Sequence, residues 1–128
     1  MAEGNKKEDK RFSLVARVKS SNHAWRGLGI LFRTTHNAWL HVVFTVLAIY
    51  LGFLVNISCT EWLVLILAIG LVFISEAINT AIEIDIDLTS PEYHPYARDT
   101  KDVAAGAVLL AVIVAIVIGA IIFLPKLV

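Results

Sequence analysis

Three long apolar runs, at residues 38–55, 62–82 and 103–124, dominate this chain of 128 residues. The first and third runs contain no Asp, Glu, Lys or Arg. A helix of about 20 residues crosses a hydrocarbon layer of about 30 Å. A soluble fold would have to bury all three runs, and too little polar chain remains to cover them. The runs therefore predict an all-α membrane protein with three transmembrane helices.

Composition narrows the function classes further. Hydrophobic residues make up 58% of the chain, against roughly 45–50% in soluble domains. The 11 Lys and Arg residues balance the 11 Asp and Glu residues, which argues against a basic nucleic-acid-binding protein. Cys59 is the single cysteine, so the chain has no internal disulfide or cysteine-based zinc site. The length predicts a single domain over residues 1–128.

Basic residues predict the orientation, because cytoplasmic segments of membrane proteins carry an excess of Lys and Arg. Eight of the 11 basic residues precede the first run, and the linker 56–61 has none. Arg98 and Lys101 lie between the second and third runs, and Lys126 follows the third. We expect the N-terminus and segment 83–102 to be cytoplasmic, with linker 56–61 and the C-terminus outside.

The segment before the first run has two parts. Residues 1–11 are polar, and we expect a flexible tail there. Residues 12–34 place apolar side chains, including Trp25, at helical intervals, while Lys19, Arg26 and Arg33 share another face. This pattern predicts an amphipathic helix in the membrane interface. The periodicity leaves open whether the helix only anchors the protein or also forms one wall of a site open to lipid.

Polar residues interrupt the second run near its end. A charge at the centre of a span is unfavourable by about 2.5–3.5 kcal/mol on insertion scales, so Glu76 is a functional candidate. Asn79, Glu83 and Asp87 follow on the face of Glu76, and Asp85 lies on the opposite face. Such oxygens suit Mg²⁺, and a desolvated carboxylate can act as a general base. A proton or cation path, or a polar contact between helices, would also explain the row.

The segment after this row adds a second group of polar residues. Residues 90–95 read Ser-Pro-Glu-Tyr-His-Pro, which predicts a turn, and Lys101 and Asp102 stand at the start of the third run. A lysine beside carboxylates suits a metal–polyphosphate, although membrane anchoring explains it equally well. The chain has no Gly-Lys pair and hence no P-loop. His41, inside the first run, is expected to be a buried, hydrogen-bonded histidine.

Small residues recur every four positions in the third run, at Ala107, Ala111, Ala115 and Gly119. Such a stripe lets helices approach closely. Three helices make a thin bundle, and lipid should not contact an acidic helix face. We therefore expect a homo-oligomer in which neighbouring subunits cover that face.

The polar motifs together resemble the prokaryotic integral-membrane diacylglycerol kinase family, which includes undecaprenol kinases. The resemblance rests on residues 76–83 (Glu-Ala-Ile-Asn-Thr-Ala-Ile-Glu), Asp87, the 90–95 turn, residues 101–110 and the N-terminal residues 22–28. It implies a homotrimer of three-span subunits with a surface helix and shared active sites, in the bacterial cytoplasmic (inner) membrane. It also implies ATP- and Mg²⁺-dependent phosphorylation of a membrane lipid alcohol at the cytoplasmic interface.

The resemblance also assigns roles to individual residues. Glu76 corresponds to the general base that takes the proton of the lipid hydroxyl, and Glu83 to a metal and nucleotide ligand. The other positions that match nucleotide-contacting residues are His23, Glu92, Tyr93, His94, Lys101 and Asp102. The positions that match lipid-contacting or site-shaping residues are Asn22, Trp25, Asn79, Asp87 and Ala105.

This sequence departs from the family pattern at Thr35, where the family often has a second metal-binding glutamate. The number of metal ions therefore stays open. The 90–95 turn and the spacing of Asn37 and His41 resemble the undecaprenol kinase branch more than the diacylglycerol branch, and both acceptors stay open. The alternative function is a small proton- or cation-coupled membrane protein without kinase activity.

Overall fold

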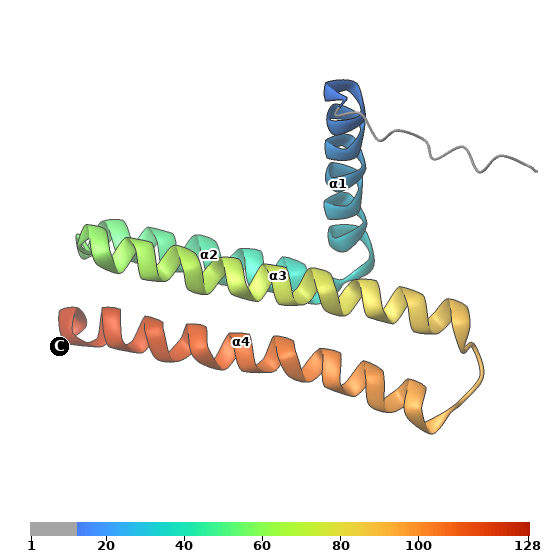
Figure 1. The fold of residues 1–128 in the computed structure, drawn as a ribbon. Helices are drawn as coiled ribbons and strands as arrows, with labels where there is room; N and C mark the ends of the chain where they lie inside the picture. Colours follow the sequence, from blue (N-terminus) through green and yellow to red (C-terminus); the bar gives the residue numbers. More distant parts are fainter. Residues whose placement is uncertain (1–12) are drawn as a thin grey trace, which may run out of the picture.

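The computed structural model describes residues 13–128 and is all-helical over that range. Its helices are α1 (Leu14–Thr34), α2 (His36–Leu54), α3 (Cys59–Thr89) and α4 (Pro95–Leu127). Figure 1 shows α2, α3 and α4 running lengthwise beside one another, while α1 projects sideways. The last three helices are each long and apolar enough to cross a membrane, as the sequence predicted. The predicted tail, residues 1–11, and residue 12 lie outside the described residues.

The helices differ in length from the apolar runs that predicted them. Helix α3 has 31 residues and α4 has 33, so each is longer than the roughly 20 residues that cross a bilayer. In Figure 1 both continue past the junction of α1 and α2, toward the loop that joins them. Segment 83–102 is therefore mostly helical, and only residues 90–94 link the two helices. Backbone hydrogen bonds continue a helix past its apolar residues, so the ends of an apolar run do not show where the helix ends.

Side chains at the helix starts explain where α3 and α4 begin. The Ser58 hydroxyl accepts a hydrogen bond from the Glu61 amide (3.3 Å), and the Glu61 carboxylate accepts one from the Ser58 amide (2.7 Å). This capping box satisfies two backbone donors that the helix leaves free. Pro95 is the first residue of α4, and His94 Nδ1 accepts from the Tyr96 amide at 3.2 Å. His94 thus has a structural role in addition to the role implied by the family resemblance.

The turn between α2 and α3 packs closely against the end of α4. Asn56 adopts a positive φ of 50°, which reverses the chain after α2. Beneath the turn, a cluster of buried side chains joins the turn, α3 and α4, and partly buried residues of α2 pack against it: Ile57, Leu65, Ile122 and Phe123 form the cluster. The ion pair between Lys126 Nζ and Glu61 (3.2 Å) connects the end of α4 to the start of α3. The C-terminus therefore lies at the same end of the bundle as this turn (Figure 1).

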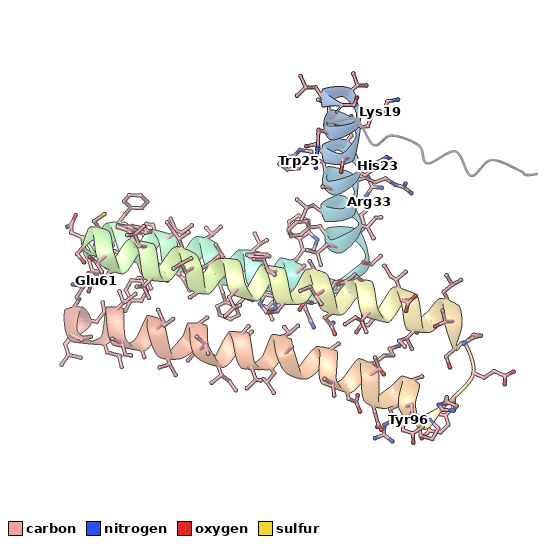
Figure 2. All side chains as sticks on the ribbon, in the orientation of Figure 1. Lys19, His23, Trp25, Arg33, Glu61 and Tyr96 are labelled. Carbon is pink, nitrogen blue, oxygen red and sulfur yellow. The ribbon has the colours of Figure 1, made fainter. Side chains whose placement is uncertain are left out.

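The elbow between α1 and α2 is held by local contacts. The Trp39 indole donates to the Phe32 carbonyl at 2.8 Å, and the two rings lie 5.5 Å apart. Beyond the elbow α1 is exposed, with Leu31 as its one buried residue. In Figure 2 Trp25 lies on one side of α1, and Lys19 and His23 lie on the other.

Gly52 is required where α2 meets α3, because a Cβ there would lie 2.7 Å from Cη2 and 2.9 Å from Cζ2 of Trp62. The Trp62 ring cannot move freely, since it packs against Phe53 with centroids 4.9 Å apart. We predict that Gly52→Ala destabilises the protein by about 1–3 kcal/mol, as overpacking does. Thermal unfolding in detergent measures this effect. Gly70→Ala is the control, because nothing lies within 4 Å of its Cβ position; equal stability of the two variants would contradict the packing argument.

Candidate active site

Glu76 is the most deeply buried polar residue described, with 1% of its surface exposed. Among residues 13–128, its one basic partner is His41 on α2, whose Nε2 lies 3.8 Å from Glu76 Oε2. The other carboxylate oxygen, Oε1, is buried and has no hydrogen-bond partner. Buried polar groups are usually satisfied, so an unpartnered carboxylate oxygen indicates a position for an incoming donor or cation.

One turn further along α3, Asn79 connects Glu76 to the more polar part of the helix. Its side-chain amide donates to Glu83 Oε1 at 3.3 Å, and its Oδ1 is buried without a partner. The next residue, Thr80, is also buried and shares a hydrogen bond with Thr35 between their hydroxyl oxygens (2.9 Å). Thr35, between α1 and α2, is thereby fixed beside the polar row.

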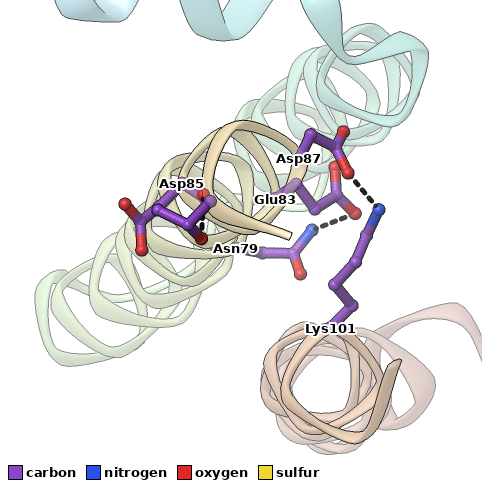
Figure 3. Close-up of polar contacts among 6 residues, drawn as sticks. Asn79, Glu83, Asp85, Asp87 and Lys101 are labelled. Carbon is purple, nitrogen blue, oxygen red and sulfur yellow. Dashed lines mark hydrogen bonds and ion pairs between the residues drawn. The ribbon is translucent and has the colours of Figure 1, made fainter. Parts of the chain in front are cut away.

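Lys101 on α4 joins the row from the opposite helix. Its Nζ donates to Asp87 Oδ1 at 2.8 Å. Lys101 precedes the apolar run 103–124. Its hydrogen bond to Asp87 raises the pKa of its ammonium group above the usual range, and the negative charges of Asp87 and Glu83 raise this pKa further. Figure 3 shows Asn79, Glu83 and Asp87 on the side of α3 that faces Lys101, with Asp85 on the other side. The predicted shared face is confirmed for these residues.

A cavity of about 360 Å³ lies at the α3–α4 loop, directly beyond this row. Five of the predicted nucleotide-contacting residues line it, namely Glu92, Tyr93, His94, Lys101 and Asp102. Arg98 also lines it and pairs with Asp102 (Nε to Oδ2, 3.6 Å). From the sequence, Arg98 contributed only to the predicted orientation, although its place one helical turn before Lys101 was a signal that both face the same region.

The remaining predicted site residues are not gathered around this cavity. Asn22, His23 and Trp25 lie on the exposed part of α1, and none lines the cavity. Ala105 is exposed on α4, one turn after Lys101. A single chain therefore assembles the residues of α3 and α4 but leaves those of α1 apart.

We expected neighbouring subunits to cover the acidic face of the second span. The chain by itself already buries two residues of that face, Glu76 and Asn79. Helix α4 packs along α3, and His41 of α2 covers the carboxylate. Ala111, from the small-residue stripe, is also buried within the chain. The face becomes exposed only farther along, at Asp87, and a homo-oligomer stays a prediction.

The donor set of this region fits a hard cation. No three His, Cys, Asp or Glu side chains among residues 13–128 are grouped closely enough to hold a metal alone. Asn79 Oδ1 is nevertheless a buried, unpartnered oxygen, and the Glu83 carboxylate is bonded to the same amide. Mg²⁺ prefers oxygen ligands and usually completes its shell with waters and substrate phosphates. These two residues therefore fit a site that a phosphate-bearing ligand would complete.

A second, apolar groove of about 310 Å³ runs between α2, α3 and α4. Its lining is almost entirely hydrophobic, and His41 and Thr45 supply the polar side chains. No pattern in the sequence indicated this groove, because it forms between residues of three separate runs.

Comparison with known proteins identifies relatives over almost the whole chain. Residues 22–123 match the family described as prokaryotic diacylglycerol kinase. The chain is 42% identical over 120 residues to an undecaprenol kinase of Bacillus subtilis, covering 94% of this chain and 98% of that protein. It is 40% identical over 109 residues to a diacylglycerol kinase of Synechocystis (84% and 62%). It is 30% identical over 100 residues to a diacylglycerol kinase of Escherichia coli (78% and 82%).

Proposed function

The chain belongs to the prokaryotic diacylglycerol kinase family and is a lipid kinase, and from this premise we propose that it uses ATP and Mg²⁺ to phosphorylate the hydroxyl of undecaprenol at the cytoplasmic edge of the bilayer. The observation that carries this proposal is the buried Glu76 carboxylate with its unpartnered Oε1. It shares a helix face with Asn79 and Glu83, and the α3–α4 cavity lies beyond them. The kinase assignment replaces the proton- or cation-coupled alternative.

In the proposed reaction Glu76 is the general base. Its Oε1 takes the proton of the lipid hydroxyl, and the lipid oxygen forms a bond to the γ-phosphorus of ATP. The bond between that phosphorus and the oxygen bridging to the β-phosphate breaks, so ADP leaves with the bridging oxygen. Phosphoryl transfer depends mainly on positioning and charge stabilisation. A base held within a packed helix bundle contributes to positioning.

The nucleotide is proposed to occupy the cavity at the α3–α4 loop. Lys101 would meet phosphate oxygens, and Tyr93 and His94 also line the cavity. Asn79 Oδ1 and Glu83 would hold Mg²⁺, which supplies neutralisation of phosphate charge when bound. Because Lys101 is already paired with Asp87, the ammonium would be shared between that carboxylate and the phosphates.

Undecaprenol is the favoured acceptor because the undecaprenol kinase relative matches this chain at 42% identity over nearly its full length. Diacylglycerol is the second candidate, since the Synechocystis relative with that name is 40% identical. Both acceptors carry a hydroxyl at the membrane surface on a long apolar body. The proposed site chemistry is the same for both.

We also propose a homotrimer in the bacterial inner membrane, with α1 in the cytoplasmic interface. Supporting this, α1 exposes Leu14, Val18 and Trp25, as an interfacial helix does. No α1 residue lines the cavity of its own chain, which supports a site that a neighbour's α1 completes. The N-terminus and the α3–α4 loop are then cytoplasmic, and the α2–α3 turn and the C-terminus are outside.

The proposed function predicts lipid-dependent transfer of labelled phosphate from ATP. Purified protein in lipid vesicles is assayed with undecaprenol and diacylglycerol side by side, with and without Mg²⁺. We expect undecaprenol to be the better acceptor and chelation of Mg²⁺ to stop the reaction. Preference for diacylglycerol would overturn the acceptor, and transfer to neither lipid would overturn the function.

The same assay tests Glu76. Glu76→Gln should lower kcat by about 10²–10⁴-fold, the usual effect of losing a general base, while the oligomer still assembles. Asp85→Asn is the matched control, because Asp85 is exposed on the other side of α3 (Figure 3). More than about a tenth of the wild-type rate in Glu76→Gln would exclude this role.

Thr35 tests the metal site, because its hydroxyl contacts Thr80, the neighbour of Asn79 in the chain. A glutamate there adds a carboxylate oxygen near the proposed Mg²⁺ ligands. We predict that Thr35→Glu lowers the Mg²⁺ concentration that gives half-maximal activity. Thr34→Glu is the control, since Thr34 is exposed and bonds to the Ile30 carbonyl of its own helix. An unchanged Mg²⁺ dependence in active Thr35→Glu protein would contradict the placement.

Shared sites predict complementation between inactive chains. In this model, Glu76 and Lys101 of one chain act with α1 of a neighbour. Mixing Glu76→Gln chains with Asn22→Ala chains then restores some complete sites. Random assembly of a cyclic oligomer makes at most about a quarter of all sites complete. Co-expression with two affinity tags confirms mixing. Glu76→Gln mixed with Lys101→Met is the control and should stay inactive, because both residues act in one chain. Background activity in the first mixture, with Asn22→Ala inactive alone, would show that each chain holds a complete site.

A further inference from the structure

His41 is the one described side chain that approaches the Glu76 carboxylate with a nitrogen atom. The 3.8 Å between Nε2 and Oε2 is longer than a hydrogen bond, but it is a distance at which the two groups interact electrostatically. Both side chains are shielded, with 15% and 2% of their surfaces exposed. The family resemblance assigned no role to His41.

Packing fixes the orientation of the imidazole ring. Phe73, one turn before Glu76 on α3, meets the ring edge-on, with centroids 6.3 Å apart and planes at 82°. Phe73 is itself held by Phe32 at 6.3 Å. His41 also borders the apolar groove, whose lining contains no other acid or base. The imidazole is therefore directed at Glu76 by its surroundings.

The two carboxylate oxygens consequently have different environments. His41 faces Oε2, whereas Oε1 has no partner. A carboxylate free to rotate would present either oxygen to a substrate, and misplacement of a reacting group by about 1 Å can lower a rate 10²-fold. Holding one oxygen leaves the other in a defined position.

We propose that His41 is a positioning residue for Glu76: its Nε2–H engages Oε2 and so presents Oε1 to the lipid hydroxyl. This inference rests on the proposed function, in which Glu76 is the base. His41 exchanges no proton with the substrate. It keeps its Nε2 proton throughout the reaction, while the hydroxyl proton moves to Oε1.

Two amide substitutions at position 41 test this role. The Gln side-chain nitrogen reaches the position of Nε2, whereas the shorter Asn side chain ends near Nδ1 and cannot reach Oε2. We expect His41→Gln to keep kcat within about fivefold of the wild type and His41→Asn to lower it by tenfold to a hundredfold. The KM for ATP should stay unchanged in both, because His41 does not line the nucleotide cavity. His36→Asn, an exposed histidine on the same helix, is the matched control.

A double-substitution cycle separates positioning from a general structural effect. In a Glu76→Gln background there is no carboxylate to orient, so adding His41→Asn should change the residual rate by less than about twofold. Thermal unfolding and gel filtration of each variant establish that equal amounts of folded protein are compared.

Specific outcomes overturn the proposal. Wild-type kcat in His41→Asn shows that Glu76 needs no positioning partner, and equal loss in the Asn and Gln variants shows that the Nε2 donor is not what matters. A full further loss in the Glu76→Gln background shows that His41 acts independently of Glu76. Failure of Glu76 as the base appears separately, as an active Glu76→Gln protein, so the two proposals are distinguishable.

Discussion

The burial of a carboxylate inside a hydrophobic helix is the constraint on which the rest of this structure depends. An ionisable group in a span is unfavourable unless the protein supplies partners. Here α2 supplies His41 to one oxygen of Glu76, and Asn79 continues the polar path one turn later. The remaining unpartnered oxygens, on Glu76 and Asn79, lie in the interior. Stability alone does not explain them, whereas a substrate hydroxyl and a cation would.

The polar row makes a graded transition from the apolar bundle to water. Glu76 and Asn79 are buried, Glu83 is partly exposed, and Asp87 reaches the surface, where Lys101 pairs with it. The long ends of α3 and α4 extend past α1 to the loop between them (Figure 1), where the cavity lies. A lipid hydroxyl and a water-soluble phosphate donor need to meet at such a boundary. In the proposed function, the length of these two helices therefore has a functional consequence as well as a structural one.

Most of the architecture could be predicted from the sequence because hydrocarbon imposes a simple rule. A span needs about 20 apolar residues, and the predicted runs 38–55, 62–82 and 103–124 each lie almost entirely within an observed helix. Helical periodicity likewise placed Asn79, Glu83 and Asp87 on one face. The sequence did not reveal how far α3 and α4 extend, since capping by Ser58 and His94 and polar turns set those ends.

By itself, the sequence determined the helical membrane architecture and the order of polar groups along α3, because both follow from spacing along one chain. Only the tertiary structure decided which groups meet across helices. It brought His41 to Glu76, Thr35 to Thr80 and Lys101 to Asp87, and it showed that one chain by itself buries Glu76 and Asn79 of the acidic face. These contacts depend on the rotation and offset of one helix against another. Packing fixes those quantities, and they leave no periodic signal in the sequence.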